Sequence, residues 1–369
     1  MQKNPIPFAE IRFPDPDRSR PELEARFTNH FRAMRAERAD FDKPMNADGT
    51  VNEELWQELL WNVHIPRSAL RRIDRRSACI AAREEERSGL GHLKSEDRKR
   101  LETLREGVGV VPVPSEHRAD ELAAELHDRF PWMGAATELV WQALRRSIRI
   151  GDAGFRLPPL LLVGPPGIGK STWARHLATL IGVPEVAIDA ASENASFAVA
   201  GSQRGWGSAG TGRPLDLILQ TRIGNPIIIV DEIEKAGRVN SISGGTYDLQ
   251  SALLAFLEPA TSRRWNCPYL RIVFDMSWLG WVLTSNSVAN LSSPLLSRCR
   301  VLRLPPIDLA QLLAFAEREA AQRGLSAISI EAIVQTLRRL HDRGRTIDLR
   351  TVSKRLDLAE MLEARPMLN

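Results

Sequence analysis

The chain has 369 residues, of which 43% are hydrophobic, so two or three compact units with buried cores are expected rather than one small domain. Its net charge is +4, but the 50 basic residues are interleaved with 46 acidic ones, which is typical of solvated helix surfaces and leaves nucleic-acid binding open. No apolar run approaches the roughly 18–20 residues of a membrane span, so no membrane contact is expected. Cys79, Cys267 and Cys299 are too dispersed for a disulfide framework or a closed zinc site, and we therefore expect a cytoplasmic location.

The first part of the chain, residues 1–117, is expected to be a mostly α-helical region that selects a partner or substrate. Leu55, Trp56, Leu59 and Leu60 fall on one face of a predicted helix, and we expect Trp56 and Trp61 to pack in a core rather than form a docking patch. The stretch 107–114 (GVGVVPVP) interrupts the helical pattern and is interpreted as a linker. The predicted helices cover residues 21–38, 53–63, 66–86 and 95–106.

The remainder is expected to be an α/β domain, residues 118–305, followed by a small helical lid, residues 306–369. Strand-like apolar runs alternate with helical segments, which predicts a parallel sheet covered on both faces. The expected strands are residues 160–163, 183–188, 226–230, 279–284 and 301–304, and the expected helices are residues 118–129, 135–149, 309–323, 329–343 and 349–363.

A phosphate-binding loop follows the first of these strands. The segment 164–171 (GPPGIGKS) fits G-x-x-x-x-G-K-[ST] between an apolar strand and a helix-forming segment, the context that this motif requires. Glycines let backbone N–H groups point at phosphate oxygens, Lys170 should reach the β- and γ-phosphates, and the Ser171 hydroxyl should bind Mg²⁺. The residues expected to bind ATP here are Gly164, Pro165, Pro166, Gly167, Ile168, Gly169, Lys170, Ser171 and Thr172.

Two acidic residues follow the strand expected at residues 226–230. The apolar run 227–230 ends in Asp231 and Glu232, of which the first is expected to hold Mg²⁺ and the second to polarise the attacking water. The strand 281–284 leads into Asn286, at the edge of the sheet where ligands bind. Asn286 is therefore expected to contact the γ-phosphate or the water, the alternative being a turn asparagine.

The order of these motifs resembles that of AAA+ ATPases, and is similar in particular to the ATPase module of Lon proteases. The segments 225–235 (NPIIIVDEIEK), 251–259 (SALLAFLEP), 284–287 (TSNS) and 293–298 (SPLLSR) carry the resemblance, which extends over roughly residues 131–358. It implies a homo-oligomeric ring, expected to be a hexamer. No segment of the chain resembles the peptidase domain that follows in Lon, so proteolysis is not expected. Glu234 stands where the family commonly has aspartate, a change expected to matter little.

The resemblance also implies roles for residues outside the two nucleotide motifs. Arg298 matches the arginine finger, which completes a neighbouring subunit's site in trans, with Arg300 as a competitor and a surface arginine as the alternative. Arg350 resembles the lid arginine that reports nucleotide state. Trp132 and Met133 resemble a segment that contacts adenine, although two core residues would explain them as well.

A tryptophan on a glycine-rich loop is the last candidate. Trp206, flanked by Gly205 and Gly207, lines up with the pore loop of Lon-like rings, where an aromatic side chain grips an extended polypeptide. A packed or nucleotide-sensing tryptophan is the alternative, and an indole can also stack on a nucleic-acid base.

Three functions are therefore considered. The first is an ATP-hydrolysing ring motor that remodels or unfolds polypeptide substrates. The second is a nucleic-acid-linked ATPase, such as a loader or a defence-system motor, supported by the arginines between residues 67 and 105. The third is a regulatory switch whose product is a nucleotide-dependent conformation.

Overall fold

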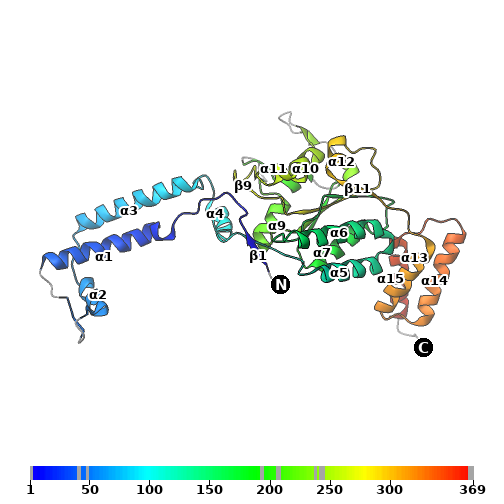
Figure 1. The fold of residues 1–369 in the computed structure, drawn as a ribbon, viewed down its shortest axis with the longest axis horizontal. Helices are drawn as coiled ribbons and strands as arrows, with labels where there is room; N and C mark the ends of the chain where they lie inside the picture. Colours follow the sequence, from blue (N-terminus) through cyan, green and yellow to red (C-terminus); the bar gives the residue numbers. More distant parts are fainter. Residues whose placement is uncertain are drawn as a thin grey trace. The chain divides into compact units, whose positions relative to one another are not determined.

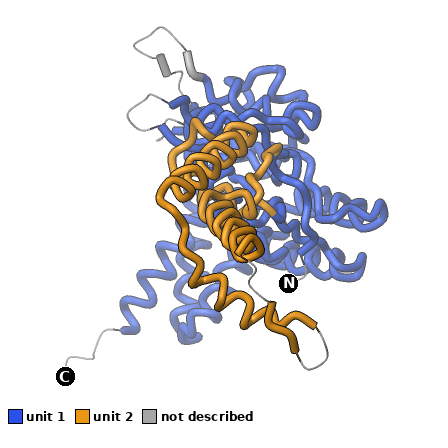
Figure 2. Tube along the Cα trace, turned by 90° about the vertical axis from the view of Figure 1, so that its left-hand side faces the viewer, with its two compact units in different colours: residues 1–9, 106–369 blue, residues 10–105 orange. Residues whose placement is uncertain are grey.

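The computed structural model describes residues 3–39, 43–46, 50–191, 195–204, 209–236, 239–240 and 246–364, with only the backbone described at 239–240 and 246–247. The chain folds into two compact units, one of residues 1–9 and 106–369 and the other of residues 10–105 (Figure 2). The first unit thus contains both the expected ATPase domain and the expected lid, and the boundary between these two stays a prediction. None of the described helices combines the length and apolar composition needed to cross a bilayer.

A five-stranded parallel sheet forms the centre of the larger unit, as the alternation of strands and helices predicted. Its strand order is β11-β3-β10-β5-β4, and each neighbouring pair is parallel. The strands are β3 (Leu160–Val163), β4 (Glu185–Asp189), β5 (Ile227–Asp231), β10 (Gly280–Ser285) and β11 (Arg300–Arg303). All carboxyl ends therefore meet at one edge and all amino ends at the other.

Helices cover both faces of this sheet (Figure 1). On one face, Leu160, Ile227 and Val282 share a buried cluster with side chains of α5 (Glu116–Arg129), α6 (Gly134–Arg149) and α7 (Lys170–Ile181). On the other, Trp281 packs against Phe256 of α10 (Leu249–Leu257), with ring centroids 5.5 Å apart. Burial on both faces explains why β3 and β5 are apolar runs without alternation, whereas the edge strands β4 and β11 are less buried.

Two short strands of the larger unit, which flank residues 10–105 in the sequence, pair with each other. β1 (Asn4–Ile6) pairs antiparallel with β2 (Val108–Val110), and Ile6 lies opposite Val108. Val111 follows with its backbone N–H and C=O bonded to the side chain of Asn225, both at 2.9 Å. The interpretation of residues 107–114 as a linker was therefore wrong: all four valines there are buried, and residues 108–110 form a strand.

Three helices follow the sheet, close to the bounds expected for the lid. They are α13 (Leu309–Gln322), α14 (Ala327–Asp342) and α15 (Leu349–Glu363). Each begins at a side-chain cap, provided by Asp308, Ser326 and Asp348, which satisfies backbone N–H groups of the first turn. Leu312, Leu337 and Val352 form the apolar contact between them.

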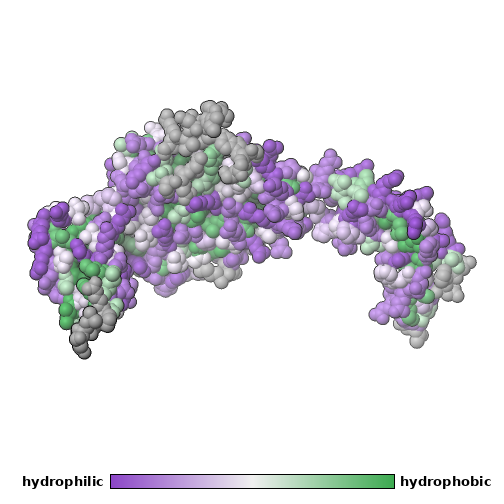
Figure 3. Space-filling view, turned by 180° about the vertical axis from the view of Figure 1, so that it is seen from behind, coloured by the Kyte–Doolittle hydropathy of each residue, from purple (hydrophilic) through white to green (hydrophobic). Residues whose placement is uncertain are grey.

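The smaller unit is helical, as expected, and its surface is mostly hydrophilic (Figure 3). It contains α1 (Arg20–Arg38), α2 (Glu53–Trp61), α3 (Arg67–Ser88) and α4 (Ser95–Glu102), and α1 lies beside α3 (Figure 1). Trp56 and Leu60 are buried, whereas Leu55 and Leu59 are exposed.

The expectation that Trp61 packs in a core was wrong, because its side chain is 69% exposed. The guanidinium of Arg32 lies over the Trp61 ring at 4.7 Å from the centroid, so a surface cation–π contact holds it.

The remaining elements are short. They are η1 (Pro16–Arg18), η2 (Pro131–Met133), α8 (Ala195–Ala200), α9 (Arg213–Thr221), η3 (Ile233–Lys235), β6 (Val239–Asn240), β7 (Thr246–Tyr247), α11 (Pro259–Ser262), β8 (Trp265–Asn266), β9 (Val273–Phe274) and α12 (Ser293–Arg298).

Candidate active site

The loop between β3 and α7 is shaped by glycines. Gly167 and Gly169 have φ values of +75° and +85°, a region that side chains with a Cβ rarely adopt. Gly169 is the residue before α7, and no side chain caps that helix among the described residues. The first N–H groups of α7 are therefore available to an anion, and the helix dipole favours a negative charge there.

Lys170 lies inside this loop, with only 8% of its surface exposed. Its Nζ donates to the carbonyls of Gly164 at 2.7 Å and Pro165 at 3.0 Å, and to Oδ1 of Asn286 at 3.0 Å. These three acceptors match the three hydrogens of an ammonium group. Burial lowers the pKa of Lys170, while the nearby carboxylates, Glu234 first among them, act to raise it.

Asp231, at the carboxyl end of β5, is joined to two hydroxyl groups. Ser171 Oγ donates to its Oδ1, and Thr284 Oγ1 donates to the same atom at 2.9 Å. A serine hydroxyl beside a carboxylate is an oxygen donor set of the kind that Mg²⁺ prefers when phosphate oxygens complete its shell. The side chains present at this point therefore fit a magnesium ion.

Glu232 follows in an unusual backbone conformation. Its φ of 55° and ψ of 44° place a non-glycine residue in the left-handed region, at a cost of about 1–2 kcal/mol. Its N–H donates to Thr284 Oγ1 at 3.2 Å, and its Oε2 accepts from Lys235 at 2.9 Å. Non-glycine residues in this conformation cluster at functional sites, where the surrounding structure holds them in place.

Glu234 makes contacts that the sequence did not suggest. Its Oε1 accepts from both the backbone N and Nδ2 of Asn286, at 3.0 Å and 2.8 Å, and its Oε2 accepts from Ser285 Oγ at 2.8 Å. These bonds fix which way the Asn286 amide points, so its Oδ1 faces Lys170. The expectation that glutamate in place of the family's usual aspartate matters little did not take account of these contacts, because the sequence does not show which groups the carboxylate reaches.

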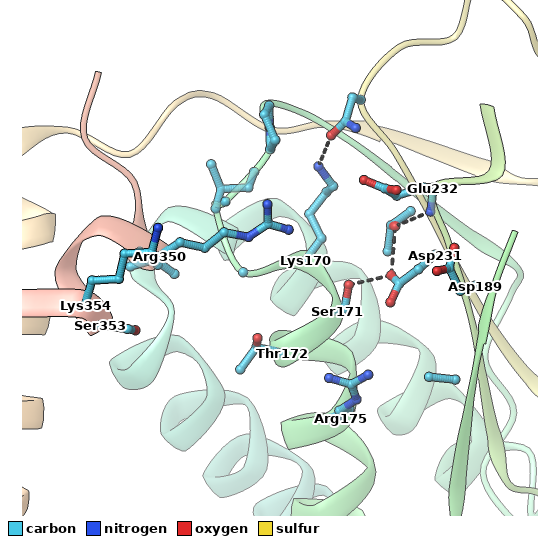
Figure 4. Close-up of a pocket in the computed structure, with 18 residues that line it drawn as sticks. Lys170, Ser171, Thr172, Arg175, Asp189, Asp231, Glu232, Arg350, Ser353 and Lys354 are labelled. Atoms are coloured by element: carbon cyan, nitrogen blue, oxygen red, sulfur yellow. Dashed lines mark hydrogen bonds between the residues drawn. The ribbon is translucent and has the colours of Figure 1, made fainter. Parts of the chain in front are cut away.

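A cavity of about 800 Å³ connects these groups to the lid. The close-up shows Lys170, Ser171, Asp231 and Glu232 on one side and the lid residues Arg350, Ser353 and Lys354 on the other (Figure 4). The lid also contacts the loop directly, since the backbone N of Leu349 donates to the carbonyl of Gly167 at 3.1 Å. Of the residues expected at the ATP site, the cavity is lined by Pro166, Gly167, Ile168, Gly169, Lys170, Ser171, Thr172, Asp231, Glu232, Asn286 and Arg350.

Other expected residues lie away from this cavity. Trp132 and Met133 are buried and do not line it. Trp132 Nε1 nevertheless donates to the carbonyl of Ile168 at 2.8 Å, a hydrogen bond that stabilises the phosphate-binding loop. Arg298 is the last residue of α12, and its Nε lies 3.3 Å from Oε2 of Glu258. Trp206 lies outside the described residues.

Comparison with known proteins agrees with this geometry. Residues 160–306 match the profile of the ATPase family associated with various cellular activities (AAA). The chain is 32% identical over 170 residues to Lon protease homolog 2, peroxisomal, of Arabidopsis thaliana, covering 46% of this chain and 19% of that protein. It is 31% identical over 185 residues to the Lon protease of Nitrosococcus oceani, covering 49% and 23%. The chain thus spans about a fifth of the length of these relatives.

Proposed function

Because the chain carries an α/β P-loop domain of the AAA+ type that is similar to the ATPase region of Lon proteases, we propose that it is an ATP-hydrolysing ring motor acting on polypeptide substrates. The observation that carries this proposal is the convergence of Lys170, Ser171, Asp231, Glu232 and Asn286 on one cavity. Those side chains supply a phosphate cradle, oxygen donors for Mg²⁺ and a carboxylate base, which together are sufficient for hydrolysis of a nucleoside triphosphate.

The residues divide the chemistry as follows. Mg²⁺, held by Ser171 and Asp231, would neutralise charge on the β- and γ-phosphates. Glu232 takes a proton from the attacking water while the water oxygen bonds to the γ-phosphorus and the bond to the bridging oxygen breaks, leaving ADP and phosphate. Lys170 gives up its three protein acceptors for phosphate oxygens, so binding of ATP breaks its bond to Asn286.

The proposal also covers how the chain assembles and how it binds its substrate. We propose a homo-hexameric ring in which Arg298 enters the neighbouring subunit's site, an arrangement worth roughly 10³–10⁵ in rate in other NTPases. The Trp206 loop would grip the polypeptide in the ring's pore, Arg350 would couple the lid to nucleotide state, and residues 10–105 would select the substrate. The free cysteines Cys79, Cys267 and Cys299 support a reducing, cytoplasmic setting.

The first test is hydrolysis and substrate capture by purified protein. Wild type should hydrolyse ATP, Lys170→Ala should not bind it, and Glu232→Gln should bind but not hydrolyse it. Held in ATP, Glu232→Gln should retain a fluorescently labelled unfolded protein that Lys170→Ala does not retain. Normal turnover by Glu232→Gln would refute the role given to this carboxylate.

Nucleic acid is the second candidate substrate, and one feature of the smaller unit favours it. Arg67, Arg71, Arg72 and Arg75 are exposed on the first half of α3, and none of their side chains has a hydrogen bond or ion pair with the described residues. A row of free guanidinium groups is suited to phosphate contacts, whose strength falls steeply with salt. Binding of labelled DNA or RNA that weakens with added salt, and is lost when Arg71 and Arg72 are changed to glutamate, would favour this candidate over the polypeptide.

A further inference from the structure

Thr284 lies beside the two carboxylates of the ATP site and carries none of the roles expected from the sequence. Val282 of β10 pairs with Ile229 of β5, and both belong to the buried cluster on the face covered by α7. Thr284 and Asp231 stand two residues further along these strands. Because side chains alternate between the faces of a sheet, both return to the α7 face, at the carboxyl ends of their strands.

The hydroxyl of Thr284 joins two acidic residues. Its Oγ1 donates to Oδ1 of Asp231 at 2.9 Å and accepts from the backbone N of Glu232 at 3.2 Å (Figure 4). A hydroxyl has one hydrogen and two lone pairs, so it can make both bonds at once, whereas a methyl group could make neither. Only 2% of the Thr284 surface is exposed, so bulk water has little access to replace these bonds. The side chain thus connects the carboxylate proposed to hold Mg²⁺ with the residue proposed to activate water.

The bond to Glu232 supports an unfavourable backbone conformation. The φ and ψ of Glu232 are 55° and 44°, in the left-handed region, where a residue with a side chain remains only when its surroundings hold it. On one side its N–H donates to Thr284, and on the other its C=O accepts from the backbone N of Lys235 at 2.8 Å. Since backbone angles set the direction in which a side chain leaves the chain, Thr284 helps to aim the Glu232 carboxylate.

Other contacts reach the same two carboxylates. Oε2 of Glu232 accepts from Lys235 Nζ at 2.9 Å, but the Lys235 side chain is half exposed, so water competes for this bond. Oδ1 of Asp231 also accepts from Ser171 Oγ, a hydroxyl that would face Mg²⁺ in the loaded site. Thr284 is buried and its branched Cβ restricts χ1, so its bonds are the ones best suited to remain during the reaction.

We propose that Thr284 is a positioning residue for ATP hydrolysis, whose hydroxyl holds the metal-binding carboxylate of Asp231 and the backbone of Glu232 in fixed relation. The inference rests on the proposed function, because that function gives these two residues their roles. Thr284 acts through them and takes no proton itself. Its contribution therefore differs from that of Asn286, whose amide oxygen accepts from Lys170.

Removal of the hydroxyl alone tests this role. Thr284→Val has nearly the same shape without the hydroxyl, and we expect it to lower kcat about thirtyfold or more while the Kd for fluorescent ATP stays within about threefold. Thr284→Ser keeps the hydroxyl and should restore kcat to within about fivefold of wild type. Normal kcat in Thr284→Val, or an equal loss in both variants, would overturn the proposal.

Thr137→Val is the matched control, because it removes a buried hydroxyl elsewhere in the same unit. Thr137 is 4% exposed, its Oγ1 accepts from Trp173 Nε1 at 3.2 Å, and it does not line the ATP cavity. Both variants lose a buried hydrogen bond, but only Thr284→Val loses the link between the carboxylates, so kcat of Thr137→Val should stay within about twofold of wild type. A comparable loss of kcat in this control would count against a specific role of Thr284.

A double-mutant cycle asks whether Thr284 acts through Glu232. Single-turnover hydrolysis of radiolabelled ATP measures the residual rate of Glu232→Gln with and without Thr284→Val. The factor lost on adding Thr284→Val should be at least about threefold smaller than in wild type, because the carboxylate that it aims is already gone. Losses that multiply in full would mean that the two residues act independently, which contradicts the positioning role.

Binding of Mn²⁺ tests the contact with Asp231 without any turnover. Mn²⁺ takes the place of Mg²⁺, and its binding to the ATP complex can be followed by electron paramagnetic resonance, with Lys170→Ala, which should not bind ATP, as the baseline. Thr284→Val should weaken this binding about fivefold or more, whereas Thr137→Val should not. Unchanged Mn²⁺ affinity in Thr284→Val would overturn the proposal. A wild type that binds ATP and Mn²⁺ but hydrolyses no ATP would instead refute the proposed function, while the Mn²⁺ affinities would still decide whether Thr284 positions Asp231.

Discussion

Glu234 holds Asn286 at two points, accepting from its backbone N at 3.0 Å and from its Nδ2 at 2.8 Å through the same oxygen. The amide is thereby turned so that Oδ1 meets Lys170 Nζ, also at 3.0 Å. A chain of contacts thus runs from the phosphate-binding loop through Asn286 to the turn that carries Glu232. Departure of Lys170 toward phosphate would change the charge felt at Asn286 and Glu234 together.

The first prediction concerns this pairing. Glu234→Ala should lower kcat for ATP about tenfold or more while leaving KM within about threefold, because it frees the Asn286 amide without touching the phosphate cradle. Glu234→Gln keeps an oxygen acceptor of the same reach and should retain most of the rate. Steady-state kinetics separates the two parameters, and equal losses in both variants would mean that the charge, rather than the orientation of the amide, is what matters.

The second prediction concerns the proposed magnesium site. Ser171→Ala removes the hydroxyl that bonds Asp231 and should raise the Mg²⁺ concentration needed for half-maximal hydrolysis at least tenfold. Ser171→Thr keeps a hydroxyl and should need nearly the same concentration as wild type. A magnesium titration of both proteins checks this, and a normal requirement in Ser171→Ala would place the ion on other ligands.

The third prediction uses two glycines with nearly the same backbone angle. Gly167 has φ +75° and a Cβ there would lie 2.1 Å from Asp348 Oδ2, whereas Gly324 has φ +72° and open space around it. Gly324→Ala should cost only the backbone strain, about 1 kcal/mol of unfolding free energy. Gly167→Ala should cost a further roughly 1–3 kcal/mol, since it pushes the start of α15 off the loop.

Denaturant unfolding of both alanine variants measures this difference, and nucleotide binding should weaken only in Gly167→Ala. Equal stability of the two proteins would show that the contact between lid and loop contributes little to the fold.

The fourth prediction concerns Asn225, whose side chain is fully buried and bonds both backbone groups of Val111. Asn225→Ala leaves a buried N–H and a buried C=O without partners, which should cost about 3 kcal/mol of unfolding free energy. Asn290→Ala, at an exposed position, should cost less than about 0.5 kcal/mol. Thermal or denaturant unfolding compares the two, and similar stability would mean that water replaces the lost bonds.

Local patterns were enough to predict the sheet and much of the site. Four-residue apolar runs such as 160–163 are signals that need no tertiary information, and the loop that follows carries its chemistry in consecutive residues. Lys170, Asp231 and Asn286 line one cavity because the carboxyl ends of parallel strands must meet at one edge of the sheet, a rule that can be applied to the sequence alone.

Features that depend on distant partners could not be predicted. β1 and β2 are only three residues each and are separated by about a hundred residues, so neither is recognisable without the other. Trp61 reads as a core residue until Arg32 is seen beside it.

The pairing of β1 with β2 has a mechanical consequence. The chain leaves toward residues 10–105 after Ile6 and returns just before Val108, and these two residues are partners at the same end of the pair. A pull on the smaller unit would therefore draw both strands the same way instead of peeling one from the other. Gly109 of β2 is also bonded to the carbonyl of Arg222 at 3.0 Å and to the N–H of Gly224 at 2.8 Å, so these backbone bonds share the load with the pair.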